Sequence, residues 1–156
     1  MDNHEKYMAM AIELAKLSLA SDDVPIGAVV VHNDKVIGEG YNKIEKLNNS
    51  LVHAEINAIN DAISNYGYKH LLDCSIYVTL EPCSMCAGAI VLARITNLIY
   101  GATDPKTGAC GSLFNIPQDE RLNHRVNVIS GVKEDECSQL LKNFFKELRK
   151  SGNGKK

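Results

Sequence analysis

Two short motifs of the 156-residue chain contain residue types that commonly bind metal ions. His53 is followed two positions later by Glu55, and Cys83 and Cys86 form a C-x-x-C pair directly after Pro82. Zinc accepts imidazole nitrogen and thiolate sulfur, and a catalytic zinc site has three protein ligands and an open fourth position. One histidine and two cysteines supply that number of ligands. The two motifs therefore predict a catalytic zinc site.

Glu55 is better suited to proton transfer than to metal binding. A carboxylate beside the open position could take a proton from water and pass it to a leaving amine, which typically contributes about 10²- to 10⁴-fold to the rate. Zinc lowers the pKa of bound water from about 15.7 towards 7. This combination suits attack of water on an amidine carbon with loss of ammonia. The predicted reaction is a hydrolytic deamination.

Each motif alone has a more ordinary explanation. An H-x-E triplet occurs by chance, and a lone C-x-x-C pair can be a redox pair or half of a structural zinc site. Cys74, Cys110 and Cys137 could complete a closed site, although none forms a second C-x-x-C pair; the alternative is that they are small buried side chains. The succession of H-A-E, a strand and E-P-C-x-x-C favours catalytic zinc.

The elements that must position these residues follow from the hydrophobic pattern. Proline favours the first turn of a helix, so a helix is predicted from Pro82 to about Ala93, and its positive end favours thiolates. The order of the elements predicts a mixed α/β fold with helices covering a central sheet. The other predicted elements are helices over Tyr7–Leu19, Ala54–Ile63 and Asp135–Arg149, a hairpin of Ile26–Val31 and Val36–Tyr41, and strands at Ser75–Leu80, Leu98–Tyr100 and around Val126–Ile129.

Composition indicates one globular domain over residues 1–150. Hydrophobic residues make up 45% of the chain and charged residues 23%. No apolar run approaches the roughly 20 residues of a membrane span, and the start of the chain does not resemble a signal peptide. Five cysteines, an odd number, argue against a disulfide framework and for a reducing compartment. We therefore expect a cytoplasmic protein without a membrane partner.

Charge gives a weaker indication of the binding partner. The net charge of −2 does not favour polyanion binding by the whole molecule. The C-terminal region from Lys142 is basic and could contact phosphates, although a solvated helix face would show the same pattern. Residues 151–156 are predicted to form a flexible basic tail.

From about Met8 to Arg149 the chain resembles the cytidine-deaminase-like superfamily and, within it, the bacterial tRNA-specific adenosine deaminases. Both metal motifs belong to this resemblance, and the downstream segments separate the tRNA enzymes from deaminases of cytosine, guanine, deoxycytidylate and riboflavin precursors. The resemblance is carried by Val24–Ala28, Gly38–Asn42, His53–Glu55, Tyr77–Cys83, Met85–Ala89, Gly101–Ala102, Asp104–Ala109, Gly111–Leu113, Asn123–Arg125 and Phe144–Phe145.

The resemblance implies a three-layer α-β-α sandwich with a central mixed sheet of about five strands. It also implies one zinc ion per subunit and conversion of adenosine to inosine at the wobble position of an arginine tRNA. A homodimer is expected, with each RNA site completed near the subunit interface, and DNA is not an expected partner.

The resemblance further assigns roles to individual residues. Asn42 would hydrogen-bond the flipped nucleoside, although it could simply cap a turn. The Phe144–Phe145 pair could likewise be a core contact of the last helix. The residues implied in substrate binding are Asn42, the backbone of Ala54, Asp104 and Lys106 at the entrance, and Asn123, Phe145 and Arg149 along the RNA groove.

Two features depart from this pattern. Ser50-Leu51-Val52 stand where family members commonly have Pro-Thr-Ala, directly before the predicted ligand His53. Asp22-Asp23 add negative charge near the predicted RNA edge, and nothing in the sequence explains them. Neither departure touches the metal motifs.

Two other functions have to be weighed against the leading one. A deaminase of a free base or nucleoside, such as guanine, cytosine or cytidine, would share the zinc motifs but would need neither a basic terminal helix nor the Asp104–Leu113 segment. A zinc-stabilised RNA-binding module would need a closed four-ligand site, whereas the sequence offers three ligands and a glutamate.

Overall fold

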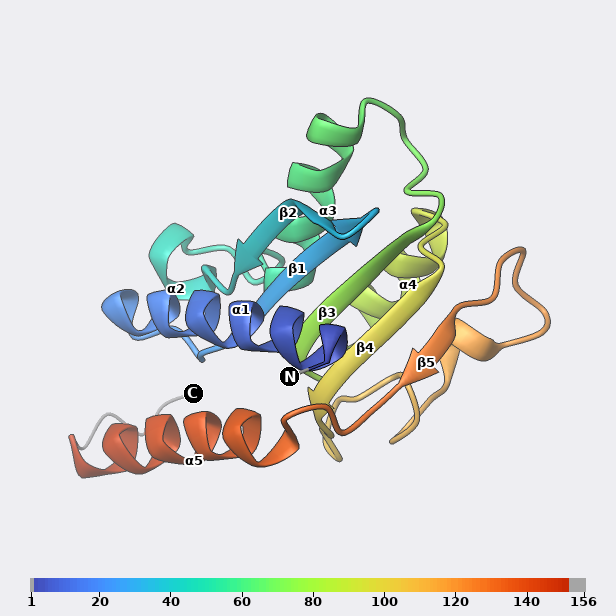
Figure 1. Cartoon of the computed structure of the whole chain (residues 1–156). Helices are drawn as coiled ribbons and strands as arrows, with labels where there is room; N and C mark the ends of the chain where they lie inside the picture. The colour runs from blue at the N-terminus through green and yellow to red at the C-terminus, as the bar shows by residue number, and fades with distance from the viewer. Residues whose placement is uncertain (1, 152–156) are drawn as a thin grey trace.

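The computed structural model describes residues 2–151 and has a five-stranded mixed sheet at its centre (Figure 1). Its strands are β1 (Gly27–His32), β2 (Lys35–Tyr41), β3 (Cys74–Leu80), β4 (Asn97–Ala102) and β5 (Asn127–Ile129). They lie in the order β2-β1-β3-β4-β5. β1 pairs antiparallel with both β2 and β3, whereas β3, β4 and β5 run parallel to one another.

Helices cover both faces of this sheet (Figure 1). The helical segments of the described residues are α1 (Asn3–Leu17), η1 (Ser18–Ser21), α2 (Ile44–Leu47), α3 (Ala54–Tyr66), α4 (Ser84–Leu92), η2 (Ile116–Gln118) and α5 (Glu134–Lys150). On one face, α3 and α4 share an apolar core with Ala28 and Val30 of β1. On the other, α1 and α5 share a core with Val29 and Val31. Because successive strand residues point to opposite faces, β1 is buried on both sides, which confirms the predicted three-layer sandwich.

The predicted elements are present, but several begin or end elsewhere. The first helix begins at Asn3 rather than Tyr7, because Asp2 caps it by accepting a hydrogen bond from the Glu5 amide at 2.9 Å. α4 begins at Ser84, because Cys83 is still extended, with φ −75° and ψ 178°. The one-turn helix α2 and the two 3-10 segments are too short to show a period, and the sequence did not predict them. Of the predicted tail, residues 152–156 lie outside the described residues.

The hairpin of β1 and β2 turns at Asn33 and Asp34, between the two strands that the sequence predicted. Both residues have positive φ, at 50° and 61°. Asn and Asp tolerate this left-handed conformation better than other non-glycine residues, which is why the pair marks a hairpin.

Small residues bring α3 unusually close to β2. A Cβ atom at Gly38 would overlap the carbonyl oxygen of Ala58, and one at Gly40 would overlap that of Ala54. Ala54, Ala58 and Ala62 recur every four residues and form one face of α3, which is fully buried. This contact fixes the height of α3 above the sheet, and with it the position of the helix N-terminus.

The outer edge of β2 is covered by polar side chains from the same helix. Asn57 donates to the carbonyl oxygen of Tyr41 at 2.9 Å, and Asn65 donates to that of Ile37 at 2.7 Å. Between them, Asp61 accepts a hydrogen bond from the Glu39 amide at 2.9 Å. Four residues of helix rise about 6 Å, close to the rise of two strand residues, so helix and strand stay in register. Backbone groups that another strand could bind are thereby occupied.

Candidate metal and catalytic site

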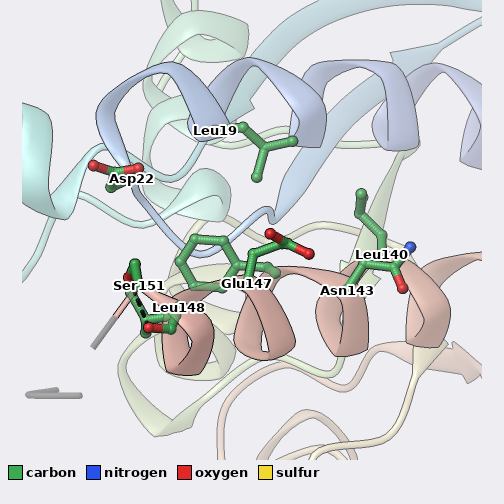
Figure 2. Close-up of a pocket in the computed structure, with 8 residues that line it drawn as sticks. Leu19, Asp22, Leu140, Asn143, Glu147, Leu148 and Ser151 are labelled. Atoms are coloured by element: carbon green, nitrogen blue, oxygen red, sulfur yellow. Dashed lines mark hydrogen bonds between the residues drawn. The ribbon is translucent and has the colours of Figure 1, made fainter. Parts of the chain in front are cut away.

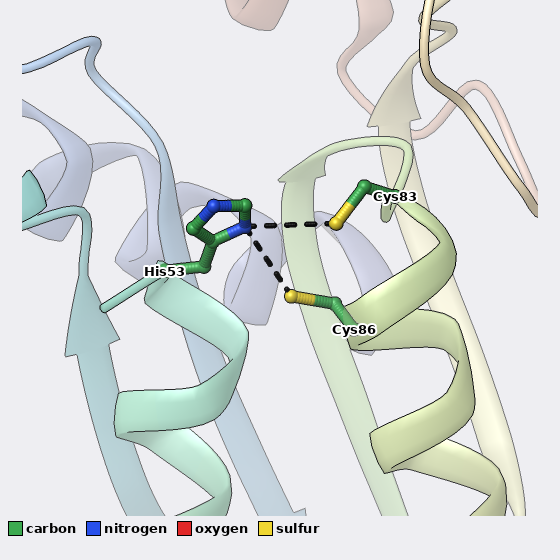
Figure 3. Close-up of side chains that lie close together, drawn as sticks. All are labelled: His53, Cys83 and Cys86. Carbon is green, nitrogen blue, oxygen red and sulfur yellow. Dashed lines mark hydrogen bonds between the residues drawn. The ribbon is translucent and has the colours of Figure 1, made fainter. Parts of the chain in front are cut away.

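The three predicted metal ligands meet between the N-terminal ends of two helices. Figure 3 shows His53, at the start of α3, facing Cys83 and Cys86 at the start of α4. His53 Nδ1 lies 3.6 Å from Cys83 Sγ and 3.5 Å from Cys86 Sγ. The ligand atoms of all three residues lie within 4.8 Å of one another.

The local backbone explains why these side chains are free to converge. His53 and Cys83 are the N-cap residues of α3 and α4, both in extended conformation, and neither side chain caps its own helix. Cys86 follows in the first turn of α4 and is fully buried. The unpaired amides at a helix N-terminus carry partial positive charge, which stabilises a nearby thiolate.

The spacing and chemistry of the group fit a zinc ion. Zn–N and Zn–S bonds of about 2.0 and 2.3 Å at tetrahedral angles separate neighbouring ligand atoms by about 3.5 to 3.8 Å. Within residues 2–151, this is the only group of three or more His, Cys, Asp or Glu side chains close enough to hold a metal ion. Cys74, Cys110 and Cys137 are buried outside it, so they do not close the site with further sulfur ligands.

The pKa shifts of these three side chains also favour the binding of a cation. A hydrogen bond from Cys86 lowers the pKa of Cys83 to about 4. The same contact raises the pKa of Cys86, and burial raises it further. Hydrogen bonding with Cys83 raises the pKa of His53. Two sulfurs held this closely can both be thiolates only beside a positive ion, as zinc ligation requires.

Glu55 lies in the first turn of α3 and is 4% exposed. Burial raises the pKa of its carboxyl to about 7, against the lowering influence of its own backbone amide and of His53. It is not part of the group of metal-binding side chains. A carboxyl group that titrates near neutral pH can both accept and donate a proton, which is what a general acid/base requires.

A cavity of about 480 Å³ reaches this site and brings together four of the predicted substrate contacts. Its lining includes His53, Asn42, Asp104, Lys106 and Phe145, together with Val24, Ile26, Ile44, Leu80, Thr103, Pro105, Thr107 and Leu141. Apolar walls with a few polar groups suit a flat base taken out of its stack.

The other predicted contacts lie elsewhere. Ala54 is fully buried next to His53 and does not line the cavity. Asn123 and Arg149 are exposed, the first in the segment that leads to β5 and the second in the last turn of α5, and neither lines the cavity. The amide of Asn42 also holds a turn, donating to Val24 O at 3.1 Å and accepting from the Ile44 amide at 3.3 Å.

A separate depression of about 790 Å³ lies between the end of α1 and α5 (Figure 2). Leu19 points into it from η1, and Leu140 and Leu148 line it from α5. It contains none of the metal-site residues, so cavity size alone does not indicate the chemistry. Phe144 lines this depression and Phe145 is 41% exposed, so the pair is not an enclosed core contact.

Asp23, which the sequence left unexplained, has a structural role. It is 1% exposed, and its carboxylate accepts hydrogen bonds from the amides of Glu45 at 2.5 Å and Lys46 at 3.1 Å. These are free amides in the first turn of α2, so a buried charge is compensated and the short helix is held. Asp22 remains exposed and lines the depression beside α5.

Sequence reasoning missed a further buried carboxylate, Glu81, which is 2% exposed. Its Oε1 accepts hydrogen bonds from the Asp104 amide at 2.9 Å and the Ser112 hydroxyl at 2.5 Å. Its Oε2 accepts from the amides of Cys110 at 3.1 Å and Ser112 at 2.9 Å. Burial alone would raise the pKa of Glu81, but the hydrogen bonds outweigh it and lower the pKa. The only sequence signal was a glutamate at the end of an apolar strand, directly before Pro82.

The fold and this site define a deaminase, and comparison with known proteins agrees. A family model described as MafB19-like deaminase matches residues 2–149. The tRNA-specific adenosine deaminase of Bacillus subtilis (strain 168) is 47% identical over 150 residues, covering 96% of this chain and 93% of that protein.

Two solved structures relate the fold to different substrates. One comes from a study of A-to-I editing by tRNA:A34 deaminases and matches with a TM-score of 0.83 and 41% identity, covering 87% of this chain and 99% of the other. A guanine deaminase from Bacillus subtilis matches with a TM-score of 0.63 and 39% identity, covering 65% of this chain and 66% of the other. The chain belongs to the family of tRNA-specific adenosine deaminases.

Proposed function

We propose that this enzyme hydrolyses adenosine to inosine at the wobble position of an arginine tRNA. The observation that carries the proposal is the convergence of His53, Cys83 and Cys86 beside a buried glutamate that titrates near neutral pH. The length and identity of the match to relatives that are tRNA-specific adenosine deaminases support the substrate.

In this proposal His53, Cys83 and Cys86 hold one zinc ion per subunit. When bound, the ion supplies Lewis acidity that makes water a stronger nucleophile near neutral pH. The imidazole and the two sulfurs are fixed by helix ends that pack on the sheet, so little rearrangement is needed for binding.

Glu55 is the proton carrier. It accepts a proton from the attacking water as oxygen bonds to C6 of the adenine and the C6=N1 π bond opens; the second proton of the water ends on N1 of inosine. Glu55 then returns its proton to the exocyclic amine, and the C6–N bond breaks to release ammonia. Since burial brings its pKa to about 7, neither transfer is strongly uphill at neutral pH.

The cavity beside the metal site receives the extruded base. Asn42 and the Ala54 backbone contact the nucleoside, while Asp104 and Lys106 meet neighbouring nucleotides at the rim. Phe145 offers a stacking face, and Asn123 and Arg149 extend the RNA contact. The position of four of these residues around one cavity supports their roles.

Residues 1–150 are proposed to be a single deaminase domain that acts as a homodimer in the cytoplasm. Leu92, 73% exposed on the apolar helix α4, is the kind of surface residue that a subunit interface covers. Within the described part of the chain, no helix is long and apolar enough to span a bilayer.

A deamination assay on a transcribed arginine tRNA with adenosine at the first anticodon position tests the function. Inosine is read as guanosine after reverse transcription, and Glu55→Ala is the matched control. Conversion confined to that adenosine supports the proposal. If the folded, zinc-loaded protein leaves the tRNA unchanged but deaminates guanine, cytosine or cytidine, the proposed substrate is wrong. The proposed hydrolytic deamination would still stand.

A further inference from the structure

We propose that Glu81 positions the substrate-facing loop 103–112 against the metal site, and that it thereby sets the affinity for the RNA. The inference rests on the proposed function, because it concerns the loop that would meet the nucleotides around the target base. Glu81 itself does not line the cavity. It is therefore a positioning residue and not a catalytic one.

The carboxylate of Glu81 fastens both ends of this loop at once. Through Oε1 it holds the Asp104 amide, at the start of the loop, and through Oε2 it holds the Cys110 and Ser112 amides, at the end. A further hydrogen bond joins the Ala109 amide to the carbonyl oxygen of Pro82 at 2.9 Å. The loop is thus tied to the two residues that directly precede Cys83.

The loop closes tightly around the carboxylate. A Cβ atom at Gly108 would overlap the Cδ and Oε2 atoms of Glu81 and the carbonyl oxygen of Asp104. The Gly108 amide donates to the same Asp104 oxygen at 2.8 Å. The loop therefore surrounds the buried carboxylate of Glu81. Only a glycine fits at position 108, where the loop backbone contacts this carboxylate.

The anchored start of the loop orders the part that faces the substrate. The Asp104 carboxylate accepts hydrogen bonds from the amides of Lys106 and Thr107 at 3.1 and 3.2 Å, and from the Thr107 hydroxyl at 2.7 Å. This turn leaves Lys106 exposed at the rim of the cavity, where it forms no ion pair with any residue of the range 2–151. Glu81 therefore fixes the turn, and the turn fixes the position of the Lys106 ammonium group, which can contact an RNA phosphate.

The chemistry requires a carboxylate and not merely a polar side chain. Each oxygen of Glu81 faces at least one backbone amide, so both must accept. In Glu81→Gln one position becomes an NH₂ donor that opposes an amide donor, whichever way the side-chain amide is turned. The substitution keeps the size of the side chain and removes the attachment at one end of the loop.

The test compares zinc-loaded wild type, Glu81→Gln, Ser112→Ala and the exposed-carboxylate control Glu39→Gln. Hydrogen–deuterium exchange of peptides covering 103–113 reports the attachment of the loop, and peptides covering 54–66 report α3. Steady-state kinetics on the arginine tRNA separate KM from kcat. Zinc content and Tm are measured on the same samples.

We expect Glu81→Gln to exchange faster in 103–113 but not in 54–66, and to raise KM roughly tenfold with kcat changed by less than about threefold. Ser112→Ala, which loses one of the four bonds, should change both readouts in the same direction by a smaller amount. If Glu81→Gln does not fold, the exchange and the KM of Ser112→Ala decide whether Glu81 holds the loop. Glu39→Gln should match wild type.

Unchanged exchange in 103–113 would overturn the inference, and so would faster exchange with an unchanged KM. A fall in kcat and zinc content with constant KM would assign Glu81 a purely structural role and also overturn it. If wild type does not deaminate the tRNA, the proposed function fails, while the exchange data still decide whether Glu81 holds the loop.

Discussion

His53 Nδ1 and Cys86 Sγ lie 3.5 Å apart although 33 positions separate them in the chain. The contact exists because α3 and α4 pack on the same face of the sheet with their N-termini at the same end. A metal bound here therefore links two helices, and its binding energy contributes to folding.

Cys86→Ala should lose most of the bound zinc and the activity. It removes a buried ligand, so we expect Tm to fall by about 5 °C or more. Metal analysis and thermal unfolding measure both effects. Cys74→Ala is the control, since Cys74 is a buried cysteine outside the metal group and should keep stoichiometric zinc. Stoichiometric zinc in Cys86→Ala would mean that Cys86 is not a ligand.

Glu55→Ala should keep zinc and fold while kcat falls by about 10²-fold or more. The reason is that the ligands remain while the proton carrier is lost. Single-turnover conversion of the tRNA, normalised to zinc content, measures the effect. An active Glu55→Ala protein would contradict the assigned role.

The activity should depend on pH through the same carboxyl. Burial raises the pKa of Glu55 to about 7, and only the deprotonated form can accept a proton from water, so kcat/KM should fall as the pH decreases through the pKa. The kcat/KM profile from pH 5 to 9 measures the limb. A profile that is flat down to pH 5 would show that the pKa is not raised.

Gly40→Ala should destabilise the protein by about 1–3 kcal/mol and weaken zinc binding. The added Cβ overlaps the backbone of Ala54, so α3 must move away from β2 and carry His53 with it. Chemical denaturation and competition with a chelator test the two effects. In Gly88→Ala the new Cβ meets no atom within 4 Å, so this helix position should be neutral or gain up to about 1 kcal/mol. Equal stability of the two variants would argue against the close contact.

The metal site was predictable because its information is local. The spacing of Cys83 and Cys86 and the pairing of His53 with Glu55 each lie within one helical turn, and the order of the elements followed from apolar periodicity. Where a helix begins was less predictable: proline favours the first turn, but here Pro82 precedes the helix, and Cys83 is its extended N-cap residue.

Contacts between distant segments were not predictable. Nothing in the sequence pairs Glu81 with Ser112, 31 residues away, or Asp23 with Glu45, 22 residues away. A buried carboxylate can be recognised only when its donors are known, and those donors are backbone amides that every residue carries. For the same reason the sequence could assign Asn42 to substrate binding but could not predict its hydrogen bonds to Val24 and Ile44, which the structure shows.

The side chains along α3 that occupy the edge of β2 also bear on how the chain emerges during synthesis. Asn57, Asp61 and Asn65 reach backbone groups only 16 to 28 residues earlier, so the hairpin and the next helix can close on each other before β3 exists. At this stage one edge of the valine-rich strand β1 still has unpaired backbone groups, which later pair with β3. The outer edge of β2 is already occupied, so it cannot pair with a strand of a neighbouring nascent chain. Replacing these three polar residues would leave the finished fold a free edge, and would expose crowded, newly made chains to aggregation.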